Sequence, residues 1–380
     1  MKSAIYAFSG DPITFGHIDI IQRAATVFDR VVVAIGCNPA KKYLFSQEER
    51  TEMARRSLLN LKNVEVKTFQ GMLVDFAYEN NIDVIVKGIR SSTDFEYEMS
   101  LHNLGESQKL GIDTFILFTR PALAHVSSSA VKDIQKEQGL IQDYVPPYVK
   151  QCVEAKLSGQ HIVGLTGEIG TGKSYVGQKL VSLANKMNLE AHNIELDHLA
   201  WQIQSDLKEE KYELVRKQIA NTFGAEVINP DGSVNRKTLG EIVFADQKKL
   251  NKLNEIMETP ILVRLRRELK NKKGLIILNA ALLAEAKMSQ LSNYNTILLS
   301  VDEKIQNKRL LDRDLSQAQI KRRLKSQYDF ASKKKSLETE IKQNQQGKLW
   351  VLNNDKASDL EIKKLLKDLL FYFGLIKLND

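Results

Sequence analysis

The chain has 380 residues, of which 43% are apolar, and its 55 Lys and Arg exceed its 47 Asp and Glu, giving a formal net charge of +8. This length is too great for one ordinary hydrophobic core and predicts two domains of about 150–200 residues each. No run approaches the roughly 18–20 apolar residues that a membrane span needs.

The N-terminal segment and the cysteines bear on where the protein works. The first ten residues, MKSAIYAFSG, lack a signal-peptide pattern. The two cysteines, Cys37 and Cys152, stand in no C-x-x-C pair and support neither a disulfide framework nor a cysteine-based metal site. We therefore expect a cytoplasmic protein.

Short apolar runs alternate with amphipathic stretches along the first half of the chain. The runs that predict strands are Ile5–Phe8, Val31–Ile35, Val64–Thr68, Val84–Val86 and Thr114–Phe118. Ser46-Gln47-Glu48-Glu49 is a capping box that opens a helix running to about Leu59. Such βαβ alternation predicts a Rossmann-like parallel sheet with helices on both faces, whose ligands bind beyond the carboxyl ends of the strands.

The most informative motif of this half is Thr14-Phe15-Gly16-His17, which places a histidine at a helix N-terminus. The preceding glycine lets the backbone approach a phosphate closely. At this point the chain resembles the HxGH nucleotidyltransferases, and specifically the pantetheine-phosphate adenylyltransferase family, over roughly residues 2–157. The further motifs of the resemblance are Pro39-Ala40-Lys41-Lys42, Lys87-Gly88-Ile89-Arg90, Asp94-Phe95-Glu96-Tyr97-Glu98-Met99 and Val126-Ser127-Ser128-Ser129.

The resemblance implies adenylyl transfer from ATP to 4′-phosphopantetheine, giving dephospho-coenzyme A and pyrophosphate. An in-line attack on the α-phosphorus needs positioning and charge stabilisation more than covalent participation by the protein. By resemblance, His17 and Lys41 are the catalytic residues, and phosphopantetheine meets Ser9, Lys41, Leu73 and Lys87. The residues implied for ATP are Phe8, Ser9, His17, Gly88, Arg90, Glu98, Ser127, Ser128 and Ser129.

Two positions depart from this family's pattern. The usual P-G-[ST]-F-D-P reads here as Ala7-Phe8-Ser9-Gly10-Asp11-Pro12, with Gly and Phe exchanged around the serine. Lys87 stands where arginine is common, which keeps the charge but loses bidentate phosphate geometry.

A domain boundary is predicted near Ser158-Gly159-Gln160, between the helix-like stretch Val145–Leu157 and an apolar run, so that the domains are 1–157 and 161–380. The apolar run Ile162–Leu165 predicts a buried strand, and a helix is expected after Lys173. Between them Gly167–Ser174 has the form G-x-x-x-x-G-K-S, a phosphate-binding loop. Its backbone N–H groups and the helix dipole favour an anion, Lys173 reaches the β- and γ-phosphates of ATP, and Ser174 ligates Mg²⁺. The ATP-binding residues expected here are Gly167, Gly170, Thr171, Gly172, Lys173 and Ser174.

The remainder of the second half is helix-rich. Gly274–Leu278 and Thr296–Val301 predict two more buried strands, Asn229-Pro230-Asp231-Gly232 a turn, and Lys342–Lys348 an exposed loop or insertion. Residues 1–157 carry 18 Lys and Arg against 19 Asp and Glu, and the remaining residues carry 37 against 28. Because acidic residues are interspersed and no aromatic pattern accompanies the basic ones, we interpret this excess as solvated helix faces that attract phosphorylated substrates, not nucleic acid.

From His161 to about Leu370 the chain resembles the dephospho-coenzyme A kinase family. Besides the phosphate-binding loop, the segments that carry this resemblance are Asn193–Ala200, Asp231–Gly240 with Ile242-Val243-Phe244, and the arginines Arg309 and Arg313. The resemblance implies a P-loop kinase α/β domain with helical substrate and lid regions. Asp197 would be the base for the ribose 3′-hydroxyl and Arg313 would stabilise the transferring phosphoryl group.

Together the two resemblances imply a bifunctional chain that catalyses the last two steps of coenzyme A synthesis, with ATP as co-substrate and Mg²⁺ as cofactor. The expected partners are ATP, 4′-phosphopantetheine and dephospho-coenzyme A, without nucleic acid or membrane. A homo-oligomer is also implied, because bacterial adenylyltransferases of this family are hexamers.

Several substitutions in the second half keep an alternative open. Glu168 puts a carboxylate inside the phosphate-binding loop, Glu195 replaces a shorter Asp, Thr259-Pro260 lacks the usual histidine, and Asn279–Leu283 lacks the family's D-x-P. These departures favour, as the alternative, an active adenylyltransferase fused to a degenerate, non-catalytic nucleotide-sensing domain. A nucleic-acid-binding P-loop protein is a weaker rival.

Overall fold

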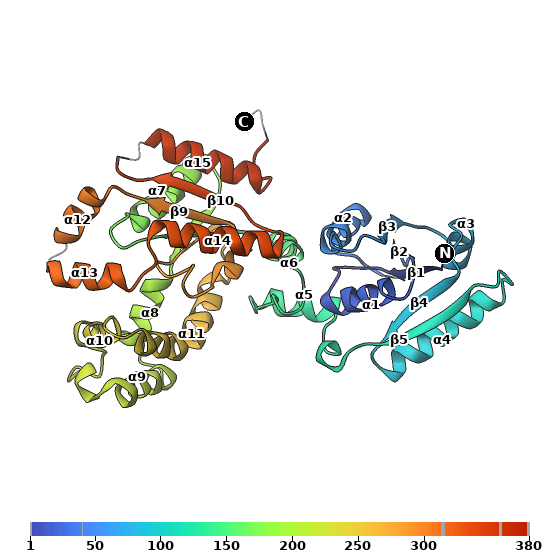
Figure 1. Ribbon diagram of the computed structural model, residues 1–380, viewed down its shortest axis with the longest axis horizontal. Coiled ribbons are helices and arrows are strands. Elements are labelled where there is room, and N and C mark those ends of the chain that lie inside the picture. The colour runs from blue at the N-terminus through green and yellow to red at the C-terminus, as the bar shows by residue number, and fades with distance from the viewer. Residues whose placement is uncertain (1, 40, 313–315, 357–358, 378–380) are drawn as a thin grey trace. The chain divides into compact units, whose positions relative to one another are not determined.

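The computed structural model describes residues 2–39, 41–312, 316–356 and 359–377, and it divides into two compact units, Met1–Leu157 and Ser158–Asp380 (Figure 1). The described part of the first unit holds a five-stranded parallel sheet in the order β3-β2-β1-β4-β5. Its strands are β1 (Ser3–Phe8), β2 (Arg30–Ile35), β3 (Val64–Thr68), β4 (Val84–Ile89) and β5 (Asp113–Phe118). Its α-helices are α1 (Phe15–Ala25), α2 (Gln47–Ser57), α3 (Leu73–Glu79), α4 (Ser92–Glu106), α5 (Ser128–Lys136) and α6 (Pro147–Val153).

The parallel sheet and the five strands predicted for this half are confirmed. Strand β4 continues past Val86 to Ile89 because its polar end still pairs with β5, where Lys87 lies opposite Ile116. The helix predicted over 145–157 is shorter than expected: α6 ends at Val153, and a π-helical turn, Glu154–Ser158, follows it.

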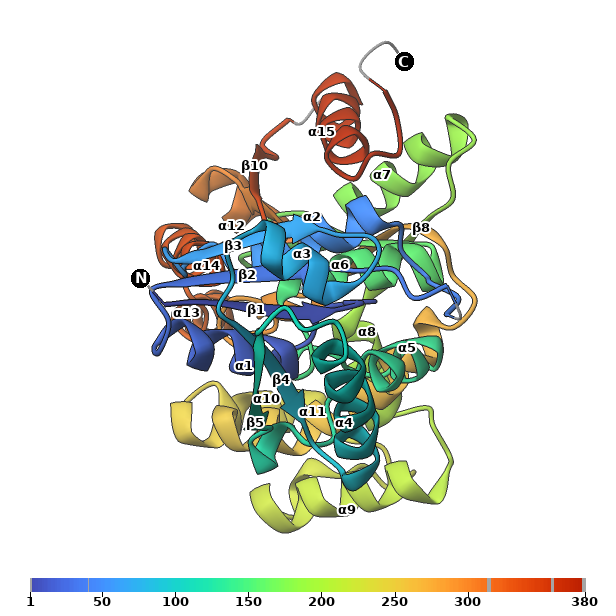
Figure 2. The same cartoon turned by 90° about the vertical axis from the view of Figure 1, so that its right-hand side faces the viewer.

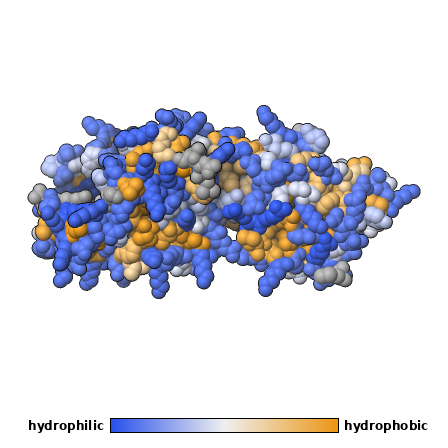
Figure 3. Space-filling model, turned by 90° about the horizontal axis from the view of Figure 1, so that it is seen from above, coloured by the Kyte–Doolittle hydropathy of each residue, from blue (hydrophilic) through white to orange (hydrophobic). Residues whose placement is uncertain are grey.

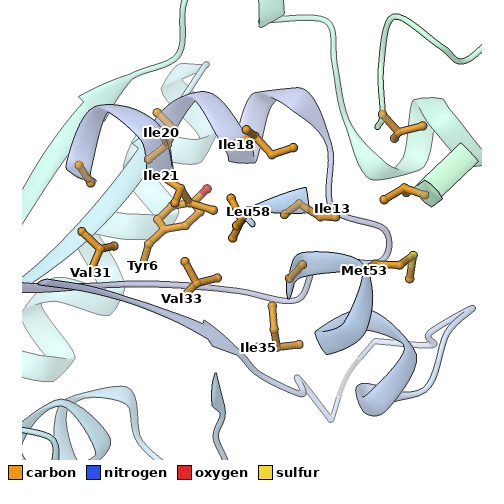
Figure 4. Packing of buried hydrophobic residues seen from close by; sticks show 14 of the residues in the cluster. Tyr6, Ile13, Ile18, Ile20, Ile21, Val31, Val33, Ile35, Met53 and Leu58 are labelled. Carbon is orange, nitrogen blue, oxygen red and sulfur yellow. The ribbon is translucent and has the colours of Figure 1, made fainter. Parts of the chain in front are cut away.

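Successive residues of the central strands pack on opposite faces of the sheet. Tyr6 and Val33 belong to a buried cluster that includes side chains of α1, α2 and α6, whereas Ile5 and Val32 belong to a second cluster with α3. Figure 4 shows part of the first cluster, with the isoleucines of α1 packed over the strand residues. Because helices cover both faces, β1 from Ala4 and β2 from Val31 are apolar to their ends, which explains why they were recognisable as short runs.

Helix α4 and the edge strand β5 depart from this pattern of burial. Hydrophilic residues cover most of the face shown in Figure 3. On α4, by contrast, no residue is buried, and Tyr97 and Leu104 are each 55% exposed. On β5, Phe118 is 73% exposed. These two elements therefore present an apolar surface that the unit itself does not cover.

The described part of the second unit holds another five-stranded parallel sheet, in the order β10-β9-β6-β8-β7. Its strands are β6 (Gln160–Gly167), β7 (Ala191–Glu195), β8 (Gly274–Asn279), β9 (Thr296–Ser300) and β10 (Leu349–Asn353). Its α-helices are α7 (Lys173–Lys186), α8 (Leu196–Gln204), α9 (Glu210–Phe223), α10 (Arg236–Val243), α11 (Gln247–Leu269), α12 (Glu303–Leu311), α13 (Gln317–Lys325), α14 (Phe330–Asn344) and α15 (Asp359–Tyr372).

Two hydrophobic clusters of the second unit lie entirely among the described residues. One joins the sheet to α7 and α15, through residues such as Leu165, Leu180 and Leu366. The other lies within α8, α9, α10 and α11 and includes Ile203 and Ile219. Figures 1 and 2 both place α9, α10 and α11 together at one end of this unit. The α/β sheet and the helical region expected from the sequence are both present.

The prediction of an exposed loop or insertion over Lys342–Lys348 is partly wrong. Helix α14 continues to Asn344, and the strand β10, which we did not predict, begins at Leu349. The polar side chains of this stretch resemble a loop, but the helix is fixed upstream by Leu337, which is 1% exposed.

The start of β8 packs closely against the backbone of Glu190, and two glycines, Gly274 and Gly232, allow this contact to be tested. Gly274 and Gly232 have φ of +77° and +81°, but a Cβ at Gly274 would lie 1.9 Å from the backbone oxygen of Glu190, whereas a Cβ at Gly232 would meet nothing within 4 Å. We expect Gly232→Ala to cost about 1–2 kcal/mol of unfolding free energy through its backbone conformation alone. Gly274→Ala should cost about 1–3 kcal/mol more, because β8 or the backbone at Glu190 must shift.

Urea unfolding followed by tryptophan fluorescence measures this difference, since the two tryptophans, Trp201 and Trp350, both belong to the second unit. Equal losses for the two variants would contradict the close approach.

Candidate functional site

The first unit contains a cavity of about 770 Å³ at the carboxyl ends of β1 and β4, where the strand order reverses. This position is the usual ligand site of an open α/β sheet, and the volume suits a nucleotide-sized ligand. The structure brings together in its lining every site residue that the sequence predicted for this half: Phe8, Ser9, His17, Lys41, Leu73, Lys87, Gly88, Arg90, Glu98, Ser127, Ser128 and Ser129.

His17 lies in the first turn of α1 and is fixed by the residue that caps the helix. The backbone N–H of Thr14 donates to Nδ1 of His17 at 3.1 Å, and the Thr14 hydroxyl lies 2.9 Å from the same nitrogen. Because Nδ1 accepts the backbone hydrogen bond, the proton of the neutral ring is on Nε2. Burial, helped by the positive charge of Arg90, lowers the pKa of His17 to about 4. At neutral pH the ring is therefore an uncharged donor.

The exchanged residues of the loop after β1 fit together. The Phe8 ring stacks on the His17 ring, with centroids 4.5 Å apart and planes 18° apart. Gly10 has φ of +61°, and a Cβ at this position would lie 2.9 Å from Cε2 of Phe8. The phenyl ring carried by residue 8 thus occupies the space that a side chain at residue 10 would need.

Two cationic residues at the end of β4 are held by carboxylates. Lys87 Nζ lies 2.7 Å from Oε2 of Glu98 on α4, and both side chains are mostly shielded from solvent. Arg90 Nε donates to Oδ2 of Asp94 at 3.2 Å, and Nη1 donates to the Val126 carbonyl at 3.3 Å. Between them, Gly88 allows α1 to approach, because a Cβ there would lie 2.8 Å from Cγ1 of Ile20.

The serine run opens α5. Ser127 is the N-cap residue and its hydroxyl oxygen accepts from the backbone N–H of Ala130 at 3.1 Å. The Ser128 hydroxyl donates to the Pro12 carbonyl at 2.8 Å, which ties this helix to the loop after β1. Lys41, on the loop after β2, is exposed and makes no ion pair among the described residues.

Sequence reasoning missed two residues that support the loops of this cavity. Arg50 of α2 is 1% exposed and donates to the carbonyls of Ser9 and Gly36, which follow β1 and β2. Asp11 accepts from the backbone N–H groups of Leu44 and Phe45, both at 3.0 Å. Asp11 belongs to the motif Ala7–Pro12, so its place in that motif could have indicated a role at the cavity. Arg50 gave none, since an arginine in a polar helix usually faces solvent.

In the second unit, the predicted phosphate-binding loop connects β6 to α7. Gly170 and Gly172 have φ of +85° and +86°, a conformation that favours glycine. Side-chain amides hold the loop from outside: Asn354 donates to the Thr171 carbonyl at 2.7 Å and Gln306 to the Ile169 carbonyl at 2.7 Å. Lys173 folds over the loop and donates to the carbonyls of Gly167 and Glu168 at 3.0 and 3.1 Å.

Acidic side chains follow β7, next to this loop. The Ser174 hydroxyl donates to Oε2 of Glu195 at 3.1 Å. Asp197 lies in the first turn of α8, because β7 ends at Glu195. Asp197 keeps access to solvent. The loss of water around its carboxyl nevertheless raises the pKa of this group, and the positive charge of Lys173 opposes the rise.

Glu168, the acidic residue in the loop, is half-buried beside a cation from a distant helix. Burial raises the pKa of its carboxyl, and the charge of Lys333 on α14 opposes this shift. The repulsion that this carboxylate would exert on ATP is thus partly offset by the lysine. Arg309 donates to the Asn354 carbonyl at 2.8 Å, and Arg313 lies outside the described residues.

Neither a metal-binding cluster nor a membrane-spanning helix is found among residues 2–39, 41–312, 316–356 and 359–377. No group of three or more His, Cys, Asp or Glu side chains there could hold a metal ion. Within the same ranges, no helix combines the length and apolar character needed to cross a bilayer.

Comparisons with known proteins match each half separately. Residues 161–348 match the family model described as dephospho-CoA kinase. Residues 9–134 match the model described as cytidylyltransferase-like.

Relatives of the first half are phosphopantetheine adenylyltransferases. That of Clostridium perfringens (strain SM101) is 40% identical over 168 residues, covering 44% of this chain and 99% of that protein. That of Caldanaerobacter subterraneus subsp. tengcongensis is 42% identical over 156 residues, covering 41% and 98%. That of Clostridium tetani is 46% identical over 146 residues, covering 38% and 91%.

The neutral state of His17 can be tested by NMR. We expect its Cε1–H resonance to keep the chemical shift of the neutral ring from pH 8 down to about 5, and to titrate with a pKa of about 4. The chain has six histidines, so the resonance is assigned by its loss in His17→Gln.

The chain unfolded in urea is the control, because all its histidines should titrate near their ordinary pKa of about 6.5. Since the folded pKa lies below the unfolded one, the unfolded state binds more protons between these values, and this residue makes stability rise with pH there. A midpoint near 6.5 in the folded protein would contradict the buried, Thr14-bound ring.

Proposed function

The chain belongs to the phosphopantetheine adenylyltransferase family, and from this premise, with the dephospho-CoA kinase match of its second half, we propose that one chain carries out the last two steps of coenzyme A synthesis. The first step joins an adenylyl group from ATP to 4′-phosphopantetheine, and the second phosphorylates the 3′-hydroxyl of the dephospho-coenzyme A so formed. Both resemblances seen in the sequence are confirmed by the family matches, and nothing in them favours the degenerate alternative. The carrying observation is that all the site residues predicted for the first half line one cavity.

In the first reaction the substrate phosphate attacks the α-phosphorus of ATP. Neutral His17 donates its Nε2 hydrogen to the α-phosphate as charge grows there, and Lys41 neutralises the incoming phosphate. Arg90 and the serines at the start of α5 hold the β- and γ-phosphates. An uncharged imidazole suits this task because donating a hydrogen bond needs no proton uptake from solvent.

The remaining residues of the cavity select and orient the two substrates. Ser9, Leu73 and Lys87 contact phosphopantetheine, while Phe8, Gly88 and Glu98 border the ATP. Because Lys87 and Glu98 are paired at 2.7 Å, the two sets of contacts meet at one ion pair.

In the second reaction the γ-phosphoryl group of ATP passes to the ribose 3′-hydroxyl. The backbone of Gly167–Ser174 and the Lys173 ammonium bind the phosphates, and Asp197 removes the hydroxyl proton. Arg313 stabilises the transferring group.

Mg²⁺ fits the hydroxyl and carboxylate oxygens near the loop, since it prefers oxygen ligands and usually keeps several waters. Ser174, beside Glu195, is the residue that would hold it together with ATP phosphates. When bound, the ion supplies charge neutralisation on the β- and γ-oxygens.

The functional domains that we propose are 1–157 and 161–380, and the division of the chain into two compact units supports these bounds. A homo-oligomer, with the hexamer as one form, stays a prediction; the exposed apolar side chains of α4 and β5 support an interface at that surface. The cytoplasmic location also stays a prediction.

The decisive experiment is mass spectrometry of the products formed by the purified chain from ATP, Mg²⁺ and 4′-phosphopantetheine. We expect coenzyme A from the wild-type chain. Lys173→Ala should stop at dephospho-coenzyme A, because the second phosphate site loses its cation, and His17→Ala should form neither product at an appreciable rate.

Two outcomes would contradict the proposal in different ways. Dephospho-coenzyme A alone from the wild-type chain would support the nucleotide-sensing alternative for the second unit. Normal pyrophosphate release by His17→Ala would remove this histidine from the first reaction.

The role of Asp197 predicts a pH dependence. Because its pKa is raised and a base must be ionised, the acidic limb of kcat for phosphorylation of dephospho-coenzyme A should lie above the ordinary range of an aspartate. Asp197→Asn should lower this kcat by about 10²–10⁴-fold and abolish the limb. Adenylyl transfer by the same variant is the matched control and should be unchanged. A kcat within a few-fold of wild type would exclude Asp197 as the base.

A further inference from the structure

Lys333, on α14, is a charged residue that the proposed mechanism does not use. Its side chain is completely buried, at 0% exposure. Its ammonium donates to the Ala281 carbonyl at 2.8 Å and to Oε1 of Glu285 at 2.5 Å. Replacing a buried ion pair by apolar side chains often leaves stability unchanged or improves it, so burial of this pair calls for a reason beyond stability.

The Ala281 peptide links this lysine to the candidate base. Ala281 lies in the turn after β8, where its carbonyl also accepts from the Thr166 hydroxyl at 3.3 Å. Asn279 of β8 pairs with Glu195 of β7, so Ala281 and Asp197 each lie two residues beyond a paired position. The backbone N–H of Ala281 favours the ionised carboxylate of Asp197 and opposes the rise in its pKa that burial causes. The peptide held by Lys333 and Thr166 therefore lies beside Asp197.

Glu285 fixes the lysine in turn. The carboxylate of Glu285 accepts from the backbone N–H of Tyr328 at 2.9 Å, immediately before α14 begins at Phe330. The ammonium is therefore anchored at both the turn after β8 and the start of α14. This leaves it little freedom to move away from Ala281.

We infer that Lys333 is a positioning residue for phosphoryl transfer: it holds the Ala281 peptide so that the N–H of that peptide orients the Asp197 carboxylate toward the acceptor hydroxyl. The inference rests on the proposed kinase reaction of the second unit. It also gives a reason for the turn sequence Asn279–Leu283, since a backbone peptide fixed by a lysine orients the base there.

Charge supports the same arrangement. Lys333 interacts electrostatically with Glu168 of the phosphate-binding loop and with Asp197. The other charged groups that act on Asp197 are Lys173, Arg236 and Glu195. The lysine therefore adds a cation, from a helix remote in sequence, to a site that contains three carboxylates.

The test compares three variants of the full chain. Lys333→Met removes the donor but leaves Glu285 as an uncompensated buried charge, which can destabilise the fold. Lys333→Met/Glu285→Gln removes both charges and keeps the turn otherwise intact. Lys334→Met is the matched control, because Lys334 is the next residue of α14, is 46% exposed and pairs only loosely with Glu338 at 3.8 Å.

Coenzyme A formation from dephospho-coenzyme A is measured for each variant, and rates are divided by the folded fraction of the second unit, measured by the fluorescence of its tryptophans Trp201 and Trp350. A misfolded fraction then does not enter kcat. We expect both Lys333 variants to lose about 10- to 100-fold in kcat, since a small misplacement of a reacting group costs this much, with KM for ATP changed less than about threefold. Lys334→Met should match the wild-type chain.

The double variant decides between positioning and charge balance. If Lys333 serves only to neutralise Glu285, the double variant recovers a kcat within about threefold of wild type, and the inference is overturned. A wild-type chain that makes no coenzyme A would overturn the proposed kinase reaction itself, which the wild-type assay alone reveals.

Discussion

Binding a phosphate through the backbone requires N–H groups that no helix or strand consumes, and both units depend on this constraint. They obtain such groups where the carboxyl end of a strand meets the N-terminus of a helix, at β1–α1 in the first unit and at β6–α7 in the second. Loops at these junctions cannot be stabilised by regular hydrogen bonding along their inner side. Other parts of each unit must therefore hold them from outside.

The two units meet this need with different chemistry. In the first, the guanidinium of Arg50 binds carbonyls of two neighbouring loops at once, and Asp11 binds backbone N–H groups of the second loop. In the second, neutral amides of Gln306 and Asn354 bind the carbonyls of the phosphate-binding loop. Neutral supports suit a loop that already carries Glu168 and Lys173, because they leave its charge balance unaltered.

Features that depend on neighbouring residues could be predicted from the sequence. Features that depend on contacts between residues distant in the sequence could not. Thr14 and Ser127 were recognisable because capping depends on residues three or four positions away. The sheets were recognisable because strands covered on both faces are uniformly apolar. Arg50 and Lys333 were not, since their burial depends on carbonyls that only the folded chain brings to them. Strand β10, which lies at the edge of its sheet beside β9, was missed as well.

The arrangement of Phe8 and Gly10 has a consequence for how this sequence can diverge. Because the ring at one position fills the space of the other, a side chain at residue 10 collides with the ring at residue 8, and loss of the ring uncovers one face of His17. Each position therefore restricts the substitutions that selection tolerates at the other. A lineage cannot drift between the two arrangements one neutral step at a time; it must pass through an intermediate of lower fitness or change both codons together. Such mutual restriction is expected to make the exchanged pair a stable hereditary marker among related chains.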